Sequence, residues 1–540
     1  MYNISINLRN KNWYEDDYGN YAIGHAFIND RLITGEKLIQ HIIQGWNENK
    51  LEEYFRELNG FFSLIIKRKH SIIASADRLR SFPLYYSLQK GHFYLSDDSD
   101  WIQKYAKENK LDDVSKTEFL LSGYVTGSCT LFPYIRQIQA GECIILNNLK
   151  QNPVLNTKRW FCFLHNDLEE WNVDELNNEL DHVINNIHKR LTLFAQNRTI
   201  VIPLSGGFDS RLILTALKRM NIEKVITFSY GRKDNKESLI SKNIADTLGF
   251  PWYFIEYNNK LWKDTIKSGK LIDFMQYSSG NVSLPHIQDW PSIIYLLEKK
   301  IINIDSIIVP GHAGDFISGG HIPHTMFLEK DPNIHRLLGY LIKQNYCLRK
   351  WEAFSTEMQE RIKNKILKII TGYGNIKTIN DLANYFELWD WQERQAKFIV
   401  NSVRVYDYFN IKWWLPLWDK EFIDFWLKVP LKLRKGSEFY DNYVITLYST
   451  ISGINTNNAR RTERTEPVYK GILRKTYNYL PEFINNYRIK RFYLSRIKNH
   501  PLNFYSIFDK NELSNYIQND IYLFNGIFAD QYIKHIEKIS

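Results

Sequence analysis

Residues 200–214, with the sequence IVIPLSGGFDSRLIL, constrain the fold of this chain more than any other segment. A run of β-branched residues precedes a loop of small residues and then apolar positions at helical spacing, which predicts a strand, a tight loop and a helix. Two adjacent glycines, Gly206 and Gly207, let successive backbone N–H groups point into one concavity at a helix N-terminus. That geometry suits a phosphate or pyrophosphate. An ordinary Gly-Gly turn that ends at an Asp or Ser cap is the alternative.

The side chains of this loop also suit a polyphosphate ligand. Ser205 and Ser210 add hydroxyl donors, and Asp209 supplies a carboxylate that can hold Mg²⁺ against phosphate oxygens. The Gly-x-x-x-x-Gly-Lys-Ser/Thr loop of the common nucleotide hydrolases does not occur at this place. Residues 205–210 instead resemble the SGGxDS pyrophosphate loop of N-type ATP pyrophosphatases, which cleave ATP between the α and β phosphates.

Length and composition indicate a globular protein of two or three domains. The chain has 540 residues, of which 44% are hydrophobic and 24% are charged. It contains no run of about 18 apolar residues and no signal-peptide pattern at its start, so we expect no membrane span. Its four widely spaced cysteines fit a reducing cytoplasm better than a disulfide framework or a zinc site.

The formal net charge of +10 allows two interpretations. A basic surface attracts nucleic acid. The alternative is a generally Lys-rich chain in which part of the excess serves a polyphosphate site, and we favour this one.

The order of predicted elements divides the chain. Residues 1 to about 150 contain short β-like runs separated by polar turns, as in a sheet-on-sheet arrangement. Between 167 and 196 the spacing of apolar residues shifts towards a period of 3.6, which predicts a linking helix. Strands and helices alternate from 199 to 257, which predicts a parallel sheet with right-handed crossovers and a ligand site at the carboxyl end of its first strand. Beyond residue 332 the pattern is mainly helical.

A second glycine-rich loop, PGHAGDFISGGH at 310–321, follows the apolar run at 306–309. It resembles the GxGxDExxGG segment of asparagine synthetases and their relatives. In that family the Asp of this loop shares a metal with the Asp of the first loop. The resemblance therefore implies that Asp315 and Asp209 bind Mg²⁺ together, and it adds Gly311 to the nucleotide-binding residues.

Further motifs resemble the same family in the same order along the chain. The N-terminal part carries likenesses of the glutaminase-domain motifs G-x-F-A and RDRxGxxPLYY, and a later segment resembles R-x-PFLD. These segments are residues 60–63, 77–86, 123–132, 140–142 and 415–419.

The resemblance implies an N-terminal Ntn-type αββα sandwich and a C-terminal doubly wound parallel-sheet ATP pyrophosphatase (PP-loop) domain with a helical extension, an α/β plus α+β fold. We predict a glutaminase-like domain at 1–155, a linking helix at 156–196 and the synthetase-like domain at 197–540.

Three departures from the family pattern bear on chemistry. The family's glutaminase uses an N-terminal Cys, whereas position 2 here is Tyr2, so we expect glutamine hydrolysis to be lost. His312 stands where asparagine synthetases carry Glu and β-lactam synthetases carry Tyr. With a pKa near neutrality it would take a proton from an attacking amine; a loop histidine bonded to backbone is the alternative. In the same loop, as part of this second departure, Phe316 replaces the acidic residue after the metal Asp.

The third departure concerns a cation. Family members place a Lys on a late loop, and the corresponding region at 458–467 offers Arg461 or Arg464 instead. A solvated basic surface is an equal alternative. Upstream, Glu393 and Arg394 either line the acceptor pocket or form a structural ion pair, and we favour the ion pair.

The resemblance predicts an ATP-dependent carboxylate–amine ligase. A carboxylate attacks the α-phosphate of ATP, which gives an acyl-adenylate and pyrophosphate, and an amine then releases AMP and forms the amide. Ser205, Gly206, Gly207 and Ser210 would cradle pyrophosphate, while the Leu204 backbone and Ser229 would hold adenine. The cofactors are ATP and Mg²⁺, and the partners are a small-molecule carboxylate and an amine or ammonia, with no nucleic acid. A homodimer is compatible with this sequence.

Other functions are compatible with part of this pattern. The Gly-His-x-Gly-Asp pattern and the Trp- and Arg-rich segment at 391–419 look most like relatives encoded with surface-polysaccharide genes, which suggests amidation of a uronic-acid sugar. Intramolecular closure, as in β-lactam synthetases or lasso-peptide cyclases, is the nearest alternative. A tRNA-modifying ATP pyrophosphatase would lack this N-terminal domain. A non-catalytic ATP-binding scaffold would not need the intact Asp209 and Asp315.

Overall fold

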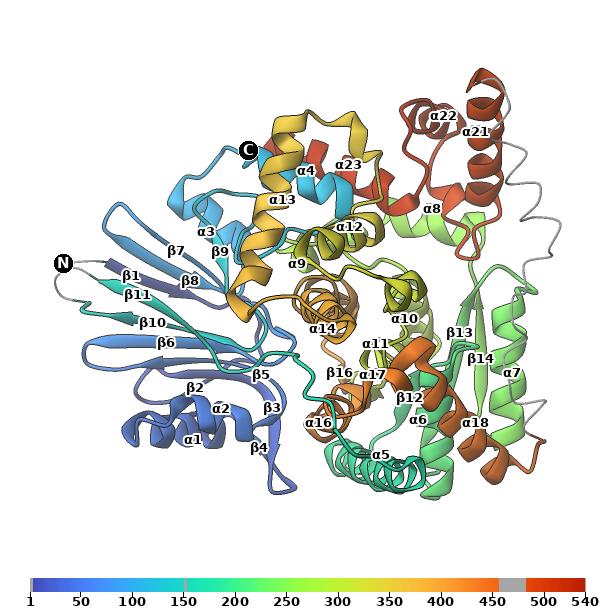
Figure 1. The fold of residues 1–540 in the computed structure, drawn as a ribbon, viewed down its shortest axis with the longest axis horizontal. Coiled ribbons are helices and arrows are strands. Elements are labelled where there is room, and N and C mark those ends of the chain that lie inside the picture. The colour runs from blue at the N-terminus through green and yellow to red at the C-terminus, as the bar shows by residue number, and fades with distance from the viewer. Residues whose placement is uncertain (1–2, 150–152, 456–481, 540) are drawn as a thin grey trace.

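The computed structural model describes residues 3–149, 153–455 and 482–539. They form an N-terminal unit with two β-sheets and a larger C-terminal unit in which helices surround one parallel sheet (Figure 1). The prediction of a mixed α/β chain with several sheets is confirmed. The last strand of the N-terminal unit, β11 (Val154–Arg159), crosses residue 155, and the domain boundaries stay predictions.

Two sheets face one another in the N-terminal unit, and helices cover their outer faces (Figure 1). The larger sheet has the order β11-β10-β6-β5-β3-β2, with β4 paired to β3, and the smaller has the order β1-β8-β7-β9. Apolar side chains such as Ile65, Phe93 and Ile144 fill the space between the sheets. The other elements are β1 (Asn3–Asn7), β2 (Tyr14–Glu15), β3 (Tyr21–Ile28), β4 (Arg31–Thr34), α1 (Glu36–Asn47), α2 (Leu51–Glu57), β5 (Asn59–Lys67), β6 (Ser71–Ala76), β7 (Tyr85–Gln89), β8 (His92–Ser96), α3 (Ser99–Ala106), α4 (Asp113–Ser122), β9 (Arg136–Gln137) and β10 (Glu142–Asn147).

Helix α5 (Val173–Ala195) connects the two units. It begins where Asn172 accepts hydrogen bonds from the backbone N–H groups of Asp174 and Glu175, and these two acidic residues suit the positive end of the helix dipole. It ends where Gln196 adopts a left-handed conformation. Its apolar face packs in the core of the C-terminal unit, so it belongs physically with the parallel sheet.

The sheet of the C-terminal unit is entirely parallel, with the order β14-β13-β12-β15-β16. Since β12 comes first in sequence and lies in the middle, successive crossovers run outward on both sides of it, and a crevice opens between β12 and β15. The strands are β12 (Ile200–Pro203), β13 (Val225–Gly231), β14 (Trp252–Glu256), β15 (Ile307–Ile308) and β16 (Lys412–Trp413).

Helices make up most of the remaining chain, as the sequence pattern beyond residue 332 predicts. They are α6 (Phe208–Arg219), α7 (Lys236–Leu248), α8 (Asn259–Lys267), α9 (Lys270–Ser279), α10 (Trp290–Glu298), α11 (Gly314–Ile317), α12 (Ile334–Asn345), α13 (Thr356–Ile370), α14 (Ile379–Trp389), α15 (Arg404–Tyr408), α16 (Lys420–Trp426), α17 (Leu431–Arg434), α18 (Glu438–Ser452), α21 (Glu482–Lys498), α22 (Lys510–Gln518) and α23 (Phe524–Ile539). Short helices lie between them: η1 (His324–Leu328), η2 (Trp351–Ala353), η3 (Thr371–Tyr373), η5 (Val400–Val403), η6 (Pro416–Trp418), η7 (Lys435–Ser437) and η8 (Phe504–Ile507). No helix of the described residues is both long and apolar enough to cross a membrane.

A π-helix, η4 (Asp390–Ile399), forms the boundary between the two units. π-helices are rare and frequently mark functional sites. One face of η4 contacts the N-terminal unit: the Trp391 indole donates to the carbonyl of Arg78 (2.8 Å), and Glu393 accepts from the backbone N–H of Gly127 (2.8 Å). Arg394, Gln395 and Ile399 of the same helix line the cavity described below.

The Glu393–Lys397 ion pair anchors η4. Both side chains are fully buried, and the Lys397 ammonium lies 2.5 Å from Glu393 and also donates to the carbonyls of Val125 (3.2 Å) and Gly127 (2.6 Å). Glu393 is thus in a structural ion pair, but its partner is Lys397 and not the predicted Arg394.

Lys397→Met should destabilise the protein by about 3–5 kcal/mol, because it leaves the Glu393 carboxylate buried without a cation. Chemical denaturation of the full chain measures this change. The exposed pair Lys420–Asp424 has the same spacing, so Lys420→Met should cost less than about 1 kcal/mol. Combining Lys397→Met with Glu393→Gln should recover part of the loss; equal destabilisation by the single and double variants would contradict the ion-pair explanation.

Candidate active site

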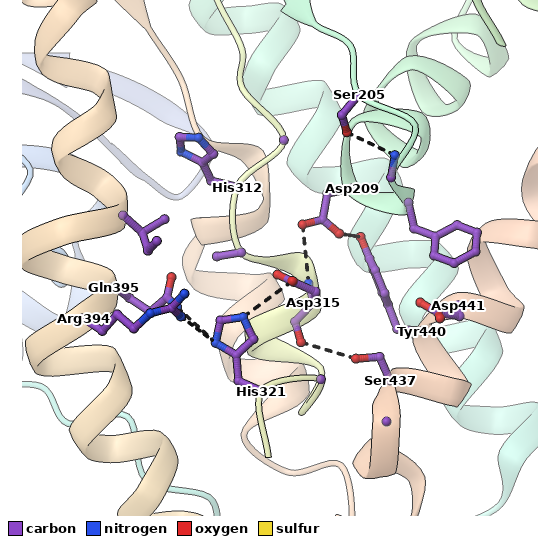
Figure 2. Close-up of a pocket in the computed structure, with 17 residues that line it drawn as sticks. Ser205, Asp209, His312, Asp315, His321, Arg394, Gln395, Ser437, Tyr440 and Asp441 are labelled. Carbon is purple, nitrogen blue, oxygen red and sulfur yellow. Dashed lines mark hydrogen bonds and ion pairs between the residues drawn. The ribbon is translucent and has the colours of Figure 1, made fainter. Parts of the chain in front are cut away.

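A cavity of about 470 Å³ lies at the carboxyl ends of β12 and β15 (Figure 2). Both predicted glycine-rich loops line it, and so do η4 and the start of α18. Figure 2 shows Ser205, Tyr440 and Asp441 on one wall and Arg394 and Gln395 on the other. The cavity is therefore the crevice that the strand order creates between the neighbouring strands β12 and β15.

The first loop joins β12 to α6 and is closed by its own serines. The backbone N–H of Ser205 donates to the Ser210 hydroxyl (3.1 Å), and the N–H of Gly207 donates to the Ser205 hydroxyl (3.1 Å). Helix α6 begins after Gly207, which provides no side-chain cap, and the N-terminus of the helix points its positive dipole end towards this loop. Of the predicted residues, Ser205, Gly207 and Asp209 line the cavity.

The second loop needs its glycines because it packs directly against the first. A Cβ at Gly311 would lie 2.5 Å from the backbone nitrogen of Ser210, and one at Gly314 would lie 2.6 Å from the Asp209 carboxylate. Between them, Ala313 adopts a left-handed φ of 72°, which bends the chain into α11. Glycine at these two positions thus brings the two loops into contact.

Asp209 and Asp315 meet where the loops touch. Asp209 accepts hydrogen bonds from the backbone N–H groups of Gly314 (2.9 Å) and Asp315 (3.4 Å) and from the Tyr440 hydroxyl (2.9 Å). Burial and the negative charge of Asp315 raise the pKa of Asp209 to about 7. The Asp315 side chain is 64% exposed to the cavity side of the loop.

This carboxylate pair fits a magnesium ion. A divalent cation would relieve the repulsion that raises the pKa of Asp209, and proteins usually bind Mg²⁺ through one or two carboxylates together with phosphate oxygens. The part of the chain that the structure describes has no group of three or more His, Cys, Asp or Glu side chains arranged to hold a metal without such phosphate oxygens.

His321 places a positive charge beside this pair. One ring nitrogen lies 2.7 Å from Asp390 and the other 3.5 Å from Asp315. Burial opposes ionisation of the imidazole, but the two carboxylates outweigh it and raise the pKa of His321 to about 9. The Arg394 guanidinium lies 3.1 Å from the same ring and 3.7 Å from Asp390. The wall opposite the first loop therefore presents two cationic side chains, with the buried Asp390 as their counter-ion, and we call it the cationic wall.

His312 lines the cavity from the second loop. One ring nitrogen lies 3.4 Å from the Ser402 hydroxyl, and the other, Nδ1, is inaccessible to solvent and has no hydrogen-bond partner in the described structure. Burial and the nearby His286 lower the pKa of His312 to about 4. The expectation of a pKa near neutrality was therefore wrong, because the sequence does not show how deeply the ring is packed. His312 is a neutral imidazole at physiological pH.

Comparisons with known proteins agree with this geometry. The asparagine synthase model matches residues 190–502, which is more than half of the chain, and a glutamine amidotransferase domain model matches residues 38–161. The chain belongs to the asparagine synthase family. It is accordingly an ATP-using ligase that forms C–N bonds.

Individual relatives of this asparagine synthase family member are distant. Microcin J25-processing protein McjC of Escherichia coli is 23% identical over 388 residues, which cover 70% of this chain and 68% of that protein. A tRNA-specific 2-thiouridylase, MnmA, of Chlamydia trachomatis is 27% identical over 135 residues, which cover 23% of this chain and 34% of that protein. The solved structure of an NH3-dependent NAD synthetase from Campylobacter jejuni matches 37% of this chain and 95% of its own at 14% identity, with a TM-score of 0.21 that is too low to indicate a shared overall fold.

Some predicted residues of this synthase-family site lie away from the cavity. The Ser229 hydroxyl donates to the carbonyl of Leu204 (2.6 Å), so these two residues meet behind the first loop, and neither lines the cavity. Gly206 and Ser210 also lie in the loop without lining the cavity, and Arg461 and Arg464 fall outside the described residues. The proposed roles of all these residues stay predictions.

Other residues of the site were missed or assigned differently from sequence. Tyr440 and Ser437 come from α18 and the turn before it, more than two hundred residues after the first loop, and no motif marks them. His321 is the last residue of the second loop, and this position is the sequence feature that could have indicated its place in the site. Arg394 was expected in an ion pair with Glu393, but Glu393 pairs with Lys397, and Arg394 lines the cavity.

Proposed function

We propose that this cavity joins a carboxylate to an amine through an acyl-adenylate. The contact between Asp209 and Asp315 carries the proposal, because it unites the two loops at one point beside the N-terminus of α6. An adenylating ligase needs that combination: N–H donors for pyrophosphate next to carboxylates that hold its counter-ion.

The first loop would hold the departing pyrophosphate. Its donors are Ser205, Gly206, Gly207 and Ser210, with Gly311 against them, and the adenine would bind near Leu204 and Ser229. Mg²⁺, bound by Asp209 and Asp315, would neutralise negative charge on the phosphate oxygens. Tyr440 orients Asp209 through its hydroxyl hydrogen bond. The acid substrate would lose no atom in this step: its carboxylate oxygen bonds to the α-phosphorus as the bond to pyrophosphate breaks.

The cationic wall would supply the positive charge that the late-loop Lys supplies elsewhere in the family. His321 and Arg394 face the first loop across the cavity and stand next to Asp315. Charge that develops on the adenylated carboxyl and pyrophosphate would lie between these two walls. Arg461 and Arg464 remain proposed contributors to the same charge stabilisation.

His312 would receive the proton of the attacking amine. Because its imidazole is neutral at physiological pH, it has a lone pair to accept that proton, although a pKa of about 4 makes it a weak base. Nitrogen then bonds to the acyl carbon, the bond to AMP breaks, and the amide product and AMP leave.

The acid that we propose is a uronic-acid sugar. The polar wall of Arg394 and Gln395 suits a polar acceptor. The tryptophans of 391–418 are buried in the core and do not line the cavity, so they offer no stacking surface there.

Closure within one molecule that carries both the acid and the amine is the second candidate. The match to Microcin J25-processing protein McjC over 70% of this chain favours it.

At the level of fold, we assign the N-terminal unit to the Ntn-type αββα sandwiches and the C-terminal unit to the PP-loop ATP pyrophosphatases. The two facing sheets with helices outside, and the parallel order around β12, support these assignments.

The test supplies ATP, Mg²⁺ and ammonia with glucuronic or galacturonic acid and measures nucleotide products and product mass. We expect AMP and pyrophosphate in equal amounts with one amide formed per AMP. ADP and phosphate instead would contradict adenylation. AMP formed only with a peptide that carries both groups, whose product has lost one water, would replace the sugar acceptor with the second candidate.

A further inference from the structure

A second cavity of about 470 Å³ lies between α4, the loop before β9 and α13 (these helices are labelled in Figure 1). It shares no lining residue with the candidate active site. Four of its residues are cationic and one is acidic: Arg136, Arg361, Lys365, Lys368 and Asp112. We call this cavity the basic groove.

The positive charge of the basic groove is largely uncompensated. Lys365 pairs with the buried carboxylate of Glu118 (2.5 Å), and Asp112 is engaged as the N-cap of α4. Among the described residues, none of the other three cations lies within ion-pair distance of a carboxylate. The Arg136 guanidinium instead donates to the thiol sulfur of Cys129 (2.9 Å).

Cations gathered in a concave site repel one another, and an anion bound between them removes that repulsion. The two guanidinium groups offer forked donors that match phosphate or carboxylate oxygens, and Lys368 adds a mobile point charge. The groove volume lies within the range of about 300–1,000 Å³ that is typical of small-molecule sites.

We propose that the basic groove binds a small polyanion, a molecule with two or more phosphate or carboxylate groups, between Arg136, Arg361 and Lys368. Three separate elements form its walls, which favours a compact ligand over an extended nucleic acid or a membrane surface. The proposal does not depend on the proposed ligase chemistry, because the two cavities share no lining residue.

Cys129 provides a local reporter of occupancy. Its partly buried thiol lines the groove, while the exposed Cys347 lies outside its lining and serves as the internal reference. The full chain is alkylated with iodoacetamide, and the rate at each cysteine is followed by peptide mass spectrometry. The probe is inorganic tripolyphosphate, and sodium chloride at equal ionic strength is the control.

We expect tripolyphosphate at ten times its Kd to slow alkylation of Cys129 about tenfold, because only the unoccupied fraction reacts, and to leave Cys347 unchanged. Arg361→Gln combined with Lys368→Gln should abolish the protection. Lys363→Gln should retain it, because Lys363 is on the same helix but pairs with Glu360 and does not line the groove. Asp209→Asn should also retain it, which separates this site from the nucleotide site.

A second measurement compares the anionic reagent iodoacetate with neutral iodoacetamide. The alkylation rate with iodoacetate, divided by the rate with iodoacetamide, should be higher at Cys129 than at Cys347. The double variant should lower this ratio at Cys129. Equal slowing by sodium chloride, or protection that survives in the double variant, would overturn the proposal. Protection by RNA or anionic vesicles with none by tripolyphosphate would replace the small ligand with a macromolecular one.

Discussion

Asp209→Asn and Asp315→Asn should each lower Mg²⁺-dependent exchange of labelled pyrophosphate into ATP by about 10³-fold or more in the presence of the acid substrate. Metal ions contribute several kcal/mol of charge stabilisation, and each 1.36 kcal/mol corresponds to about tenfold in rate. The two carboxylates are in contact through the loop backbone, so loss of either leaves an incomplete site. Exchange measured over a range of Mg²⁺ concentrations detects the loss.

The same variants should fold. Without metal, burial and the charge of Asp315 raise the pKa of Asp209, so the native state loses stability as the pH rises from about 4 to 7 and Asp209 ionises. Asp209→Asn removes the ionisable carboxyl and with it this loss of stability. We therefore expect the metal-free variant at pH 8 to have a melting temperature equal to or above that of the wild type. Mg²⁺ with ATP should then stabilise the wild type and not the variant.

Asp305→Asn is the matched control for both variants. Asp305 precedes β15, and its side chain is 73% exposed with only a distant partner, Arg198 at 3.9 Å. Its loss should change neither exchange nor stability. Near-normal exchange in Asp209→Asn or Asp315→Asn would show that the residue is no metal ligand.

Local sequence patterns predicted the centre of this fold well. The alternation of strands and helices expected from 199 to 257 is present as β12, α6, β13, α7 and β14, which together span 200–256. This region succeeds because each element is a short apolar run or helical stripe bounded by Gly, Pro or Asn, and such signals depend on neighbours in the chain. The position of the first loop at the sheet's carboxyl edge followed directly from that order.

The walls of the site were predicted less completely. Tyr440 and Arg394 reach the cavity from helices that pack against the sheet only in the folded chain, and neither carries a motif. The π-helical turn of η4 adds to the difficulty, because it changes which of its residues share a face. The prediction of a near-neutral pKa for His312 failed for the same reason, since burial depends on the tertiary structure and not on the local sequence.

The N-terminal unit has a physical connection to the cavity through η4. Glu393 and Lys397 bind the backbone of Gly127, and the adjacent residues Arg394 and Gln395 form a wall of the cavity. A displacement of the N-terminal unit would therefore move the cationic wall. The folded N-terminal unit thus contributes to the geometry of the site whether or not it has a chemistry of its own.

His312→Ala should slow amide formation by about 10²-fold and leave pyrophosphate exchange largely intact. A positioned base contributes about 10²–10⁴-fold, and the pKa of about 4 places His312 at the low end because the base is weak. Exchange precedes the attack of the amine, so it does not require this proton acceptor. The exposed His335 provides the control, and His335→Ala should alter neither reaction.

The pH dependence gives an independent test of His312. Since its imidazole is already deprotonated above about pH 5, amide formation at saturating Mg²⁺ should show no His312-dependent fall between about pH 8 and 6. The part of the rate that depends on His312 should fall only as the pH approaches 4 and the ring gains a proton. A titration near neutrality that disappears in His312→Ala would show that the bound substrates raise its pKa. Equal loss of both half-reactions would mean that His312 shapes the nucleotide loop, and no loss in either would leave it as a structural histidine beside Ser402.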